Sequence, residues 1–135
     1  MRRVVLDASA LMTFFDDRPG AESVQRLFTQ VMEARLSLLM SVVNWGEVYY
    51  SVWRTKGKET AERILSEIAQ SRVEIIPADT ELTKLAAHFR IHYKLPYADC
   101  FAAGLAYQQK ATLATADKDF LVMKRLLKIL WTTEA

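Results

Sequence analysis

The sequence predicts an α/β protein with a three-layer α/β/α arrangement around a central, mostly parallel five-stranded sheet. Two observations support this prediction. Short apolar, β-branched runs alternate with helical stretches along the chain, which is typical of βαβ units. The chain has 135 residues, of which 51% are hydrophobic and 25% charged. That length and composition suit one domain, 1–135, with a buried core.

The first strand is expected over 2–7, where an apolar, β-branched run ends at Asp7. A helix is expected over 8–17, because its large apolar residues recur at helical spacing until "RPG" stops it. The segment 21–34 is a clear amphipathic helix, with its apolar residues on one face.

A second strand is expected over 35–41, with Ser41 placed to cap the helix that follows over 42–55. Gly46 lies inside that helix, where glycine is unfavourable, so we expect a packing reason for it. A further helix with one polar face is expected over 57–71.

The third strand is expected over 72–78 and is closed by a proline. A helix over 79–94 begins at Asp79, a natural N-cap, and a compact helix rich in small residues follows over 95–110. After it come a strand, a turn with a short helix, and a last strand, over 111–115, 116–126 and 127–133.

Four acids lie in apolar or semi-apolar surroundings instead of on solvated faces. They are Asp7 in "VVLDAS", Glu47 in "NWGEVYY", Asp99 in "LPYADCFAAG" and Asp117 in "LATADKDF". Asp7 and Asp117 follow predicted strands, at the edge where parallel sheets bind ligands. Each acid alone is as easily a helix cap, or a charge at a helix N-terminus, as a ligand. Four in one chain are harder to explain in that way.

If the four carboxylates meet, they repel one another. At about 5 Å and an effective dielectric near 20, each pair costs about 3 kcal/mol. Protonation or a divalent cation would relieve this cost, and oxygen-only ligands suit Mg²⁺ or Mn²⁺. Hydrolysis of a phosphodiester is the natural chemistry of such a site. Ser9 and Thr115 each lie two residues from a key aspartate, where a hydroxyl holds a water or caps the local turn.

At this point the chain resembles the PIN-domain ribonucleases, and among them the VapC-type toxins of prokaryotic toxin–antitoxin pairs. The segments "VVLDASALMTFF", "SVVNWGEVYYSV", "LPYADCFAAGLA" and "LATADKDF" are similar to the four acidic motifs of that family, in order and over essentially the whole chain. The resemblance implies that catalysis and metal binding fall to Asp7, Glu47, Asp99 and Asp117. The supporting positions that match the family are Ser9, Asn44 and Thr115, and Asp119 is a second-choice ligand beside Asp117.

The resemblance also implies a PIN-like fold and a metal-dependent endoribonuclease that uses Mg²⁺ or Mn²⁺. It implies an RNA substrate, a cognate antitoxin protein as partner, and a homodimer. A catalytically idle PIN-like domain that binds RNA or protein is the alternative, although an idle site would be free to lose its repelling charges. A haloacid-dehalogenase-like phosphatase is a third hypothesis, but its chemistry requires a second acid two residues after the first, and this chain has Ser9 there.

The remaining features are less specific. The net charge of +2 permits a nucleic-acid partner, and the candidate phosphate contacts are Arg54, Lys56, Lys58, Arg90, Lys94, Lys118, Lys124 and Arg125. No apolar run is long enough for a membrane helix, Asp7 interrupts what would be a signal sequence, and a single cysteine, Cys100, agrees with a reducing compartment. We therefore expect a cytoplasmic protein with no membrane partner.

Two groups of side chains can be interpreted either as binding residues or as purely structural ones. His88 and His92 are four residues apart, as in some zinc sites, but without a third ligand nearby a partly exposed helix face is expected. Aromatic residues gather on the helix expected over 42–55. Stacking on RNA bases is one reading of them, and we prefer packing or contact with another protein, as with the antitoxin groove of the resembled family.

Overall fold

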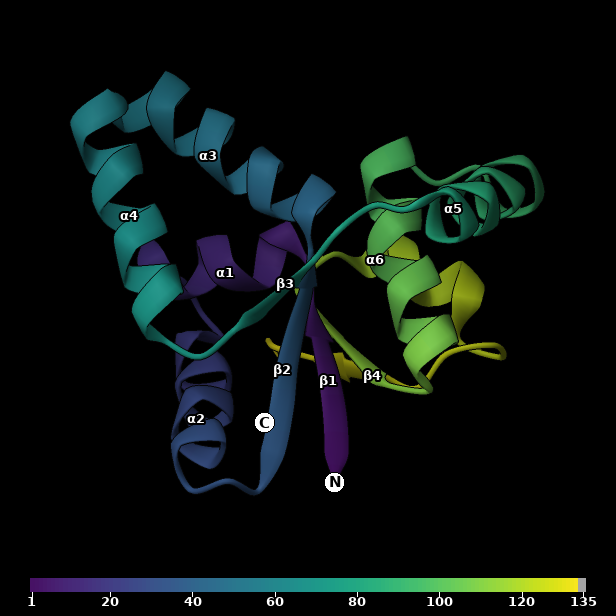
Figure 1. Ribbon diagram of the computed structural model, residues 1–135, viewed down its shortest axis with the longest axis horizontal. Helices are drawn as coiled ribbons and strands as arrows, with labels where there is room; N and C mark the ends of the chain where they lie inside the picture. The colour runs from purple at the N-terminus through teal and green to yellow at the C-terminus, as the bar shows by residue number, and fades with distance from the viewer. Residues whose placement is uncertain (134–135) are drawn as a thin grey trace.

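The computed structural model describes residues 1–133 (Figure 1). Five strands and seven helices alternate in it, in nearly the order that the sequence predicts. In chain order the elements are β1 (Arg2–Leu6), α1 (Ala8–Phe15), α2 (Ala21–Met32), β2 (Leu36–Ser41), α3 (Val42–Lys56), α4 (Lys58–Gln70), β3 (Glu74–Ile76), α5 (Thr80–Tyr93), α6 (Tyr97–Gln109), β4 (Thr112–Thr115), the 3₁₀ helix η1 (Lys118–Met123) and β5 (Ile129–Trp131).

The five strands form one sheet in the order β3-β2-β1-β4-β5, and every neighbouring pair is parallel. The predicted, mostly parallel sheet is therefore confirmed and is parallel throughout. The helices α1 to α4 cover one face and α5 and α6 cover the other, which gives the three predicted layers (Figure 1).

The alternation of side chains along β1 divides the core in two. Val4 and Leu6 face the helices α1 to α4, whereas Val5 faces α5 and α6. All three side chains are fully buried. A central parallel strand covered on both faces has to be apolar at every position, which is why this run has no polar alternation.

Three helix starts are set by local hydrogen bonds that the sequence predicts. Oδ1 of Asp7 accepts from the Ala10 amide at the start of α1. The Ser41 hydroxyl caps α3, and Asp79 caps α5. Because α1 and α3 directly follow β1 and β2, these helices begin at the carboxyl edge of the sheet (Figure 1).

The structure corrects three details. The strands expected over 72–78 and 127–133 shrink to three residues each, because both are edge strands with a neighbour on one side only. The short helix after β4 is a 3₁₀ helix. Apart from its chain neighbours and the backbone of its own helix, a Cβ added at Gly46 would meet no atom within 4 Å among the described residues, so the expected packing reason for this glycine is absent. None of the helices in residues 1–133 has the length and apolar character needed to cross a bilayer.

Candidate active site at the carboxyl edge of the sheet

Asp7 is both a helix cap and a buried acid. Its side chain accepts from the Ala10 amide (2.9 Å), from the Ser9 hydroxyl (2.8 Å) and from the Thr115 hydroxyl (2.5 Å). Only 2% of the residue is exposed. Burial raises the pKa of Asp7 to about 6, against the opposing effect of these three hydrogen bonds. The sequence left capping and ligation as alternatives. The geometry shows the cap at Oδ1, and the second carboxylate oxygen, Oδ2, accepts from both hydroxyls.

Ser9 and Thr115 join the ends of β1 and β4. Their hydroxyl oxygens are 3.1 Å apart, and both contact Asp7. The Ser9 oxygen accepts from the Ala116 amide (2.9 Å), and the Thr115 oxygen accepts from the Asp117 amide (3.0 Å). The two hydroxyls therefore fix the segment that carries Asp117 against the segment that carries Asp7. Their supporting role in catalysis stays a prediction.

Asn44 connects Glu47 to helix α6. Its Nδ2 group donates to Oε1 of Glu47 (2.8 Å) and to the carbonyl oxygen of Ala98 (3.0 Å). Asn44 is fully buried, and its own Oδ1 has no hydrogen-bond partner among the described residues. Burial raises the pKa of Glu47, the Asn44 hydrogen bond lowers it, and the charge of Asp117 raises it. Glu47 thus faces the same site as Asp117.

Asp99 lies in the first turn of α6, directly after Ala98. Its pKa is raised to about 7, first by burial and then, in decreasing order, by the charges of Asp117, Asp7, Glu47 and Asp119. The other three acids singled out in the sequence therefore all lie within electrostatic range of Asp99. The favourable field of the helix N-terminus does not offset burial and four like charges.

Asp117 is the more central of the two acids in the fourth segment. Its charge raises the pKa of Asp7, Glu47 and Asp99, whereas Asp119 acts on Asp99 alone among these three and is the smallest contributor there. Asp117 also caps η1, since its Oδ1 accepts from the Asp119 amide (2.9 Å). Asp119 itself is exposed. This geometry favours Asp117 over Asp119, as the spacing of the motif predicts.

The site suits a divalent cation in its donor chemistry. The converging groups are carboxylate oxygens, which Mg²⁺ and Mn²⁺ prefer, and their mutual repulsion would be relieved by such an ion. Within residues 1–133, no three histidine, cysteine, aspartate or glutamate side chains stand close enough together to hold a metal ion as they are. Metal binding would therefore need rotation of these side chains, while the segments that carry Asp7 and Asp117 stay joined by Ser9 and Thr115.

The two histidines lie away from this site. His88 and His92 are both exposed on α5, with ring centroids 6.3 Å apart, and Nδ1 of His92 donates to the His88 carbonyl oxygen. They form the exposed helix face that the sequence predicts.

The aromatic residues of α3 form a row from the core to the surface. Trp45 and Tyr49 pack against the core, while Trp53 and Tyr50 are about half exposed. The ring centroids of Trp45 and Tyr49 are 6.3 Å apart, and those of Tyr49 and Trp53 are 5.5 Å apart. Packing therefore accounts for the inner half of the row, and the outer half is available to a partner.

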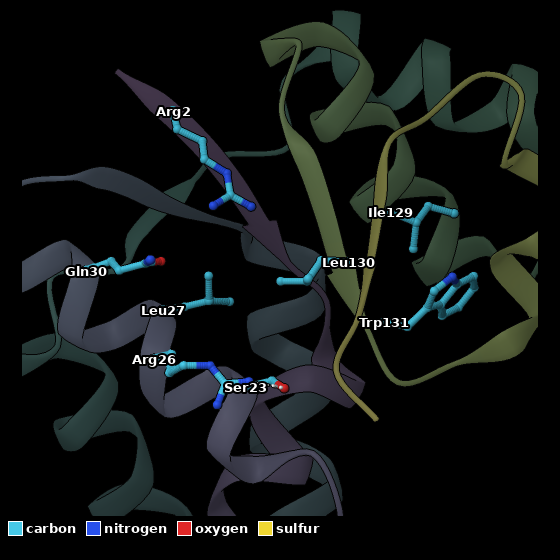
Figure 2. A pocket seen from close by; sticks show the side chains of 8 residues that line it. All are labelled: Arg2, Ser23, Arg26, Leu27, Gln30, Ile129, Leu130 and Trp131. Carbon is cyan, nitrogen blue, oxygen red and sulfur yellow. Dashed lines mark hydrogen bonds between the residues drawn. The ribbon is translucent and has the colours of Figure 1, made fainter. Parts of the chain in front are cut away.

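A hollow of about 330 Å³ lies away from the acids, between α2 and the strands β1 and β5 (Figure 2). None of the four acids lines it. Its lining residues are Arg2, Ser23, Arg26, Leu27, Gln30, Ile129, Leu130 and Trp131. Sequence reasoning did not single out this region, although Arg2 and Arg26 are a visible basic signal.

The PIN domain family model matches residues 4–126. Among solved structures, the chain is similar to VapBC2 from Rickettsia felis bound to a promoter DNA fragment, with a TM-score of 0.74 and 21% identity over 95% of this chain and 97% of that one. The chain is also similar to DNA-bound VapBC from Salmonella typhimurium, with a TM-score of 0.72 and 17% identity over 98% of this chain and 99% of that one. A third similar structure is Mycobacterium tuberculosis VapC20, a sarcin-ricin loop cleaving toxin. Its TM-score is 0.70, with 12% identity over 87% of this chain and 92% of that one. No curated protein matches the sequence.

Proposed function

Since this chain belongs to the PIN-domain family, we propose that it is a metal-dependent endoribonuclease and the toxin of a toxin–antitoxin pair. The observation that carries the proposal is that the charges of Asp7, Glu47, Asp117 and Asp119 all act on Asp99. Four like charges around a half-buried carboxyl are costly to a small domain unless a cation neutralises them. The similarity to VapBC structures supports the biological role, because VapBC is a family of toxin-antitoxin systems.

In this mechanism Asp7, Asp99 and Asp117 would hold the ion, and Glu47 would complete the set. When bound, Mg²⁺ or Mn²⁺ supplies Lewis-acid chemistry, in which a phosphoryl oxygen is polarised and water becomes a better nucleophile. Asp99, in the first turn of α6, would also orient the attacking water. In-line attack of water would form a new P–O bond and break the P–O3′ bond, and the leaving 3′ oxygen would take up a proton, so that the products have 5′-phosphate and 3′-hydroxyl ends.

The supporting residues keep the carboxylates in place during this reaction. Ser9 and Thr115 hold both Asp7 and the Asp117 segment, so the ends of β1 and β4 keep a fixed separation. Asn44 fixes the Glu47 carboxylate and ties α3 to α6 beside Asp99. Such fixed positions lower the cost of reorganising the site when the charge on phosphorus develops.

The antitoxin is the proposed protein partner, with the outer half of the α3 aromatic row, Tyr50 and Trp53, as its contact surface. Lys58 lies 5.2 Å above the Trp53 ring and Arg54 5.7 Å above the Tyr50 ring, so the surface is aromatic and basic at once. The proposal also includes a homodimer in the cytoplasm.

The experiment is a cleavage assay on total RNA with Mn²⁺ or Mg²⁺, repeated with EDTA. Asp99→Asn should lower the rate by at least about a hundredfold, the usual scale for losing a group that positions the reaction. Asp79→Asn is the matched control, because it removes an equal charge from a helix start outside the site and asparagine caps equally well. Cleavage in EDTA, or full activity of Asp99→Asn, would contradict the mechanism. Absence of any cleavage would favour the RNA- or protein-binding alternative.

A further inference from the structure

Basic residues stand at the amino edge of the sheet, opposite the acids. Arg2 and Arg3 open β1, Lys110 stands two residues before β4, and Lys128 stands directly before β5. These three strands are neighbours in the order β1-β4-β5 and run parallel, so the four side chains start from the same edge. We call these four residues the basic edge. Asp7 and Asp117 follow β1 and β4, so the sheet carries opposite charges at its two ends.

The basic edge surrounds one hollow. All four side chains line a depression of about 490 Å³, together with Met1, Gln109 and Thr112. Each of the four residues is exposed. The Arg3 guanidinium donates to the Gln109 carbonyl oxygen at the end of α6 (3.3 Å), which orients that side chain. Within residues 1–133 none of the four has a carboxylate within 4 Å.

Two neighbouring hollows continue the same surface. Arg2 also lines the hollow of Figure 2, into which Arg26 reaches from α2 with the polar side chains of Ser23 and Gln30 beside it. Lys110 and Lys128 also line a third hollow of about 580 Å³. In the part of the chain that the structure describes, no aspartate or glutamate lines any of the three hollows. The surface is therefore concave, cationic and rich in hydrogen-bond donors.

We propose that the basic edge binds the phosphate backbone of RNA at a segment remote from the cleaved bond. Unpaired cations around a concave polar surface are the electrostatic footprint of a polyanion, and contacts to phosphates position a nucleic acid without reading its sequence. This inference rests on the proposed function, because it concerns the same substrate.

The placement of the basic edge also indicates a substrate class. β1 has five residues and is therefore about 16 Å long, at roughly 3.3 Å per residue. An RNA that contacts both ends of the sheet has to pass around the molecule over at least that length. The substrate is therefore an RNA of several nucleotides or more, whose phosphates reach the basic edge while another of its bonds lies at the acids.

The test measures RNA binding without catalysis. Fluorescence anisotropy follows labelled bulk transfer RNA binding to the full chain in EDTA at several salt concentrations. Arg2→Gln combined with Lys128→Gln should weaken binding by at least about fivefold and lower the slope of log K against log salt by about two, roughly one for each lost phosphate contact. The matched control combines Arg63→Gln with Lys84→Gln, two exposed residues outside the three hollows, and should change binding less than about twofold.

Lys110→Gly separates binding from folding. Lys110 has a φ of 52°, a left-handed conformation that glycine adopts without steric cost. This variant should keep or raise the melting temperature while weakening RNA binding. A lower melting temperature with unchanged binding would overturn the inference.

Two further outcomes would overturn it. Equal losses in the basic-edge variant and the control would show that the position of the charges is irrelevant. Competition by polyglutamate as strong as that by unlabelled transfer RNA would show a general polyanion site. Failure of the proposed function would give a different result. Total RNA would then stay uncut with Mn²⁺, while the same binding pattern in EDTA would still support the inference.

Discussion

At the scale of single residues, Asp7 and Asp99 hold protons to an unusually high pH. Ordinary aspartate has a pKa of 3.8, whereas burial raises the pKa of Asp7 to about 6 and that of Asp99 to about 7. The folded chain therefore binds more protons than the unfolded chain between about pH 4 and pH 7. Over that interval stability falls as the pH rises, and the cost is complete above pH 7.

Asp99→Asn should remove much of this cost. In EDTA at pH 8 it should raise the free energy of unfolding by about 1–3 kcal/mol, and at pH 4, where the folded carboxyl is already neutral, by close to none. Urea unfolding at the two pH values measures the difference, with Asp79→Asn as control. A stabilisation that is equal at both pH values would contradict the assigned cause.

Thr115→Val tests the hydroxyl that supports Asp7. The substitution keeps the shape but removes the donor to Asp7 and the acceptor for the Asp117 amide, so it should cost about 1–3 kcal/mol. It should also raise the pKa of Asp7 above 6, because a hydrogen bond to the charged form is lost. Carboxyl ¹³C NMR titration measures that shift.

Thr132→Val is the control for this experiment. Thr132 is equally buried, but its hydroxyl has no hydrogen-bond partner in the described chain. Replacing an unpaired buried hydroxyl should be neutral or stabilising. If the two variants lost the same stability, the hydrogen bonds of Thr115 would not be the cause.

At the scale of elements, the site is built from helix starts. Asp7 caps α1 and Asp117 caps η1, so two of the four acids begin the element that follows their strand. Asp99 lies in the first turn of α6, and Glu47 lies within α3. The carboxyl edge is where these starts meet, because every strand of a parallel sheet ends there.

Gly46→Ala should stabilise α3. Glycine in a helix interior is less favourable than alanine by about 0.5–1 kcal/mol, and a Cβ at position 46 would meet no atom within 4 Å of it. Urea unfolding should show a gain of that size. A loss would mean that this backbone needs glycine for a local reason.

Gly20→Ala is the opposite case. Gly20 has a φ of 101°, and a Cβ there would lie 2.6 Å from the Thr132 carbonyl oxygen. Alanine should therefore destabilise the fold through both strain and overlap. Urea unfolding of both variants compares the two positions directly. A higher free energy of unfolding for Gly46→Ala and a lower one for Gly20→Ala would distinguish a glycine that can be replaced from one that the fold requires.

At the scale of the whole molecule, the sheet separates charge. Acids gather beyond the carboxyl ends of its strands and bases before the amino ends of β1, β4 and β5. The positive and negative charges nearly cancel, so the net charge is only +2 and composition alone does not reveal their separation. A cation and a polyanion therefore have distinct places on one small domain.

Mn²⁺ should stabilise the whole fold in a pH-dependent way. At pH 8 the carboxylates are ionised, and an ion concentration one hundred times the Kd should add about 2.7 kcal/mol of stability. At pH 5 Asp7 and Asp99 hold protons, so the gain should largely vanish. Thermal unfolding with and without Mn²⁺ measures it. An equal gain at both pH values, or one retained by Asp99→Asn, would place the ion elsewhere.

The sequence alone determined the order of the elements, the parallel sheet and the caps at Ser41 and Asp79, and it singled out the four acids while leaving Asp7 either a cap or a ligand. These features depend on periodicity and on contacts within about four residues along the chain, so they are visible locally. The two edge strands were predicted too long, because a strand's length depends on the neighbours it pairs with.

Only the tertiary structure decided how the acids are held. The Thr115 hydroxyl reaches Asp7 across 108 positions of sequence, and Asn44 reaches Ala98 across 54. It also decided that Gly20 is required while Gly46 has open space around it. It placed the four residues of the basic edge around one hollow. The physical reason is the same in each case. Which strands become neighbours is settled by packing both faces of the sheet, and no local pattern encodes a distance between segments that meet only after that packing.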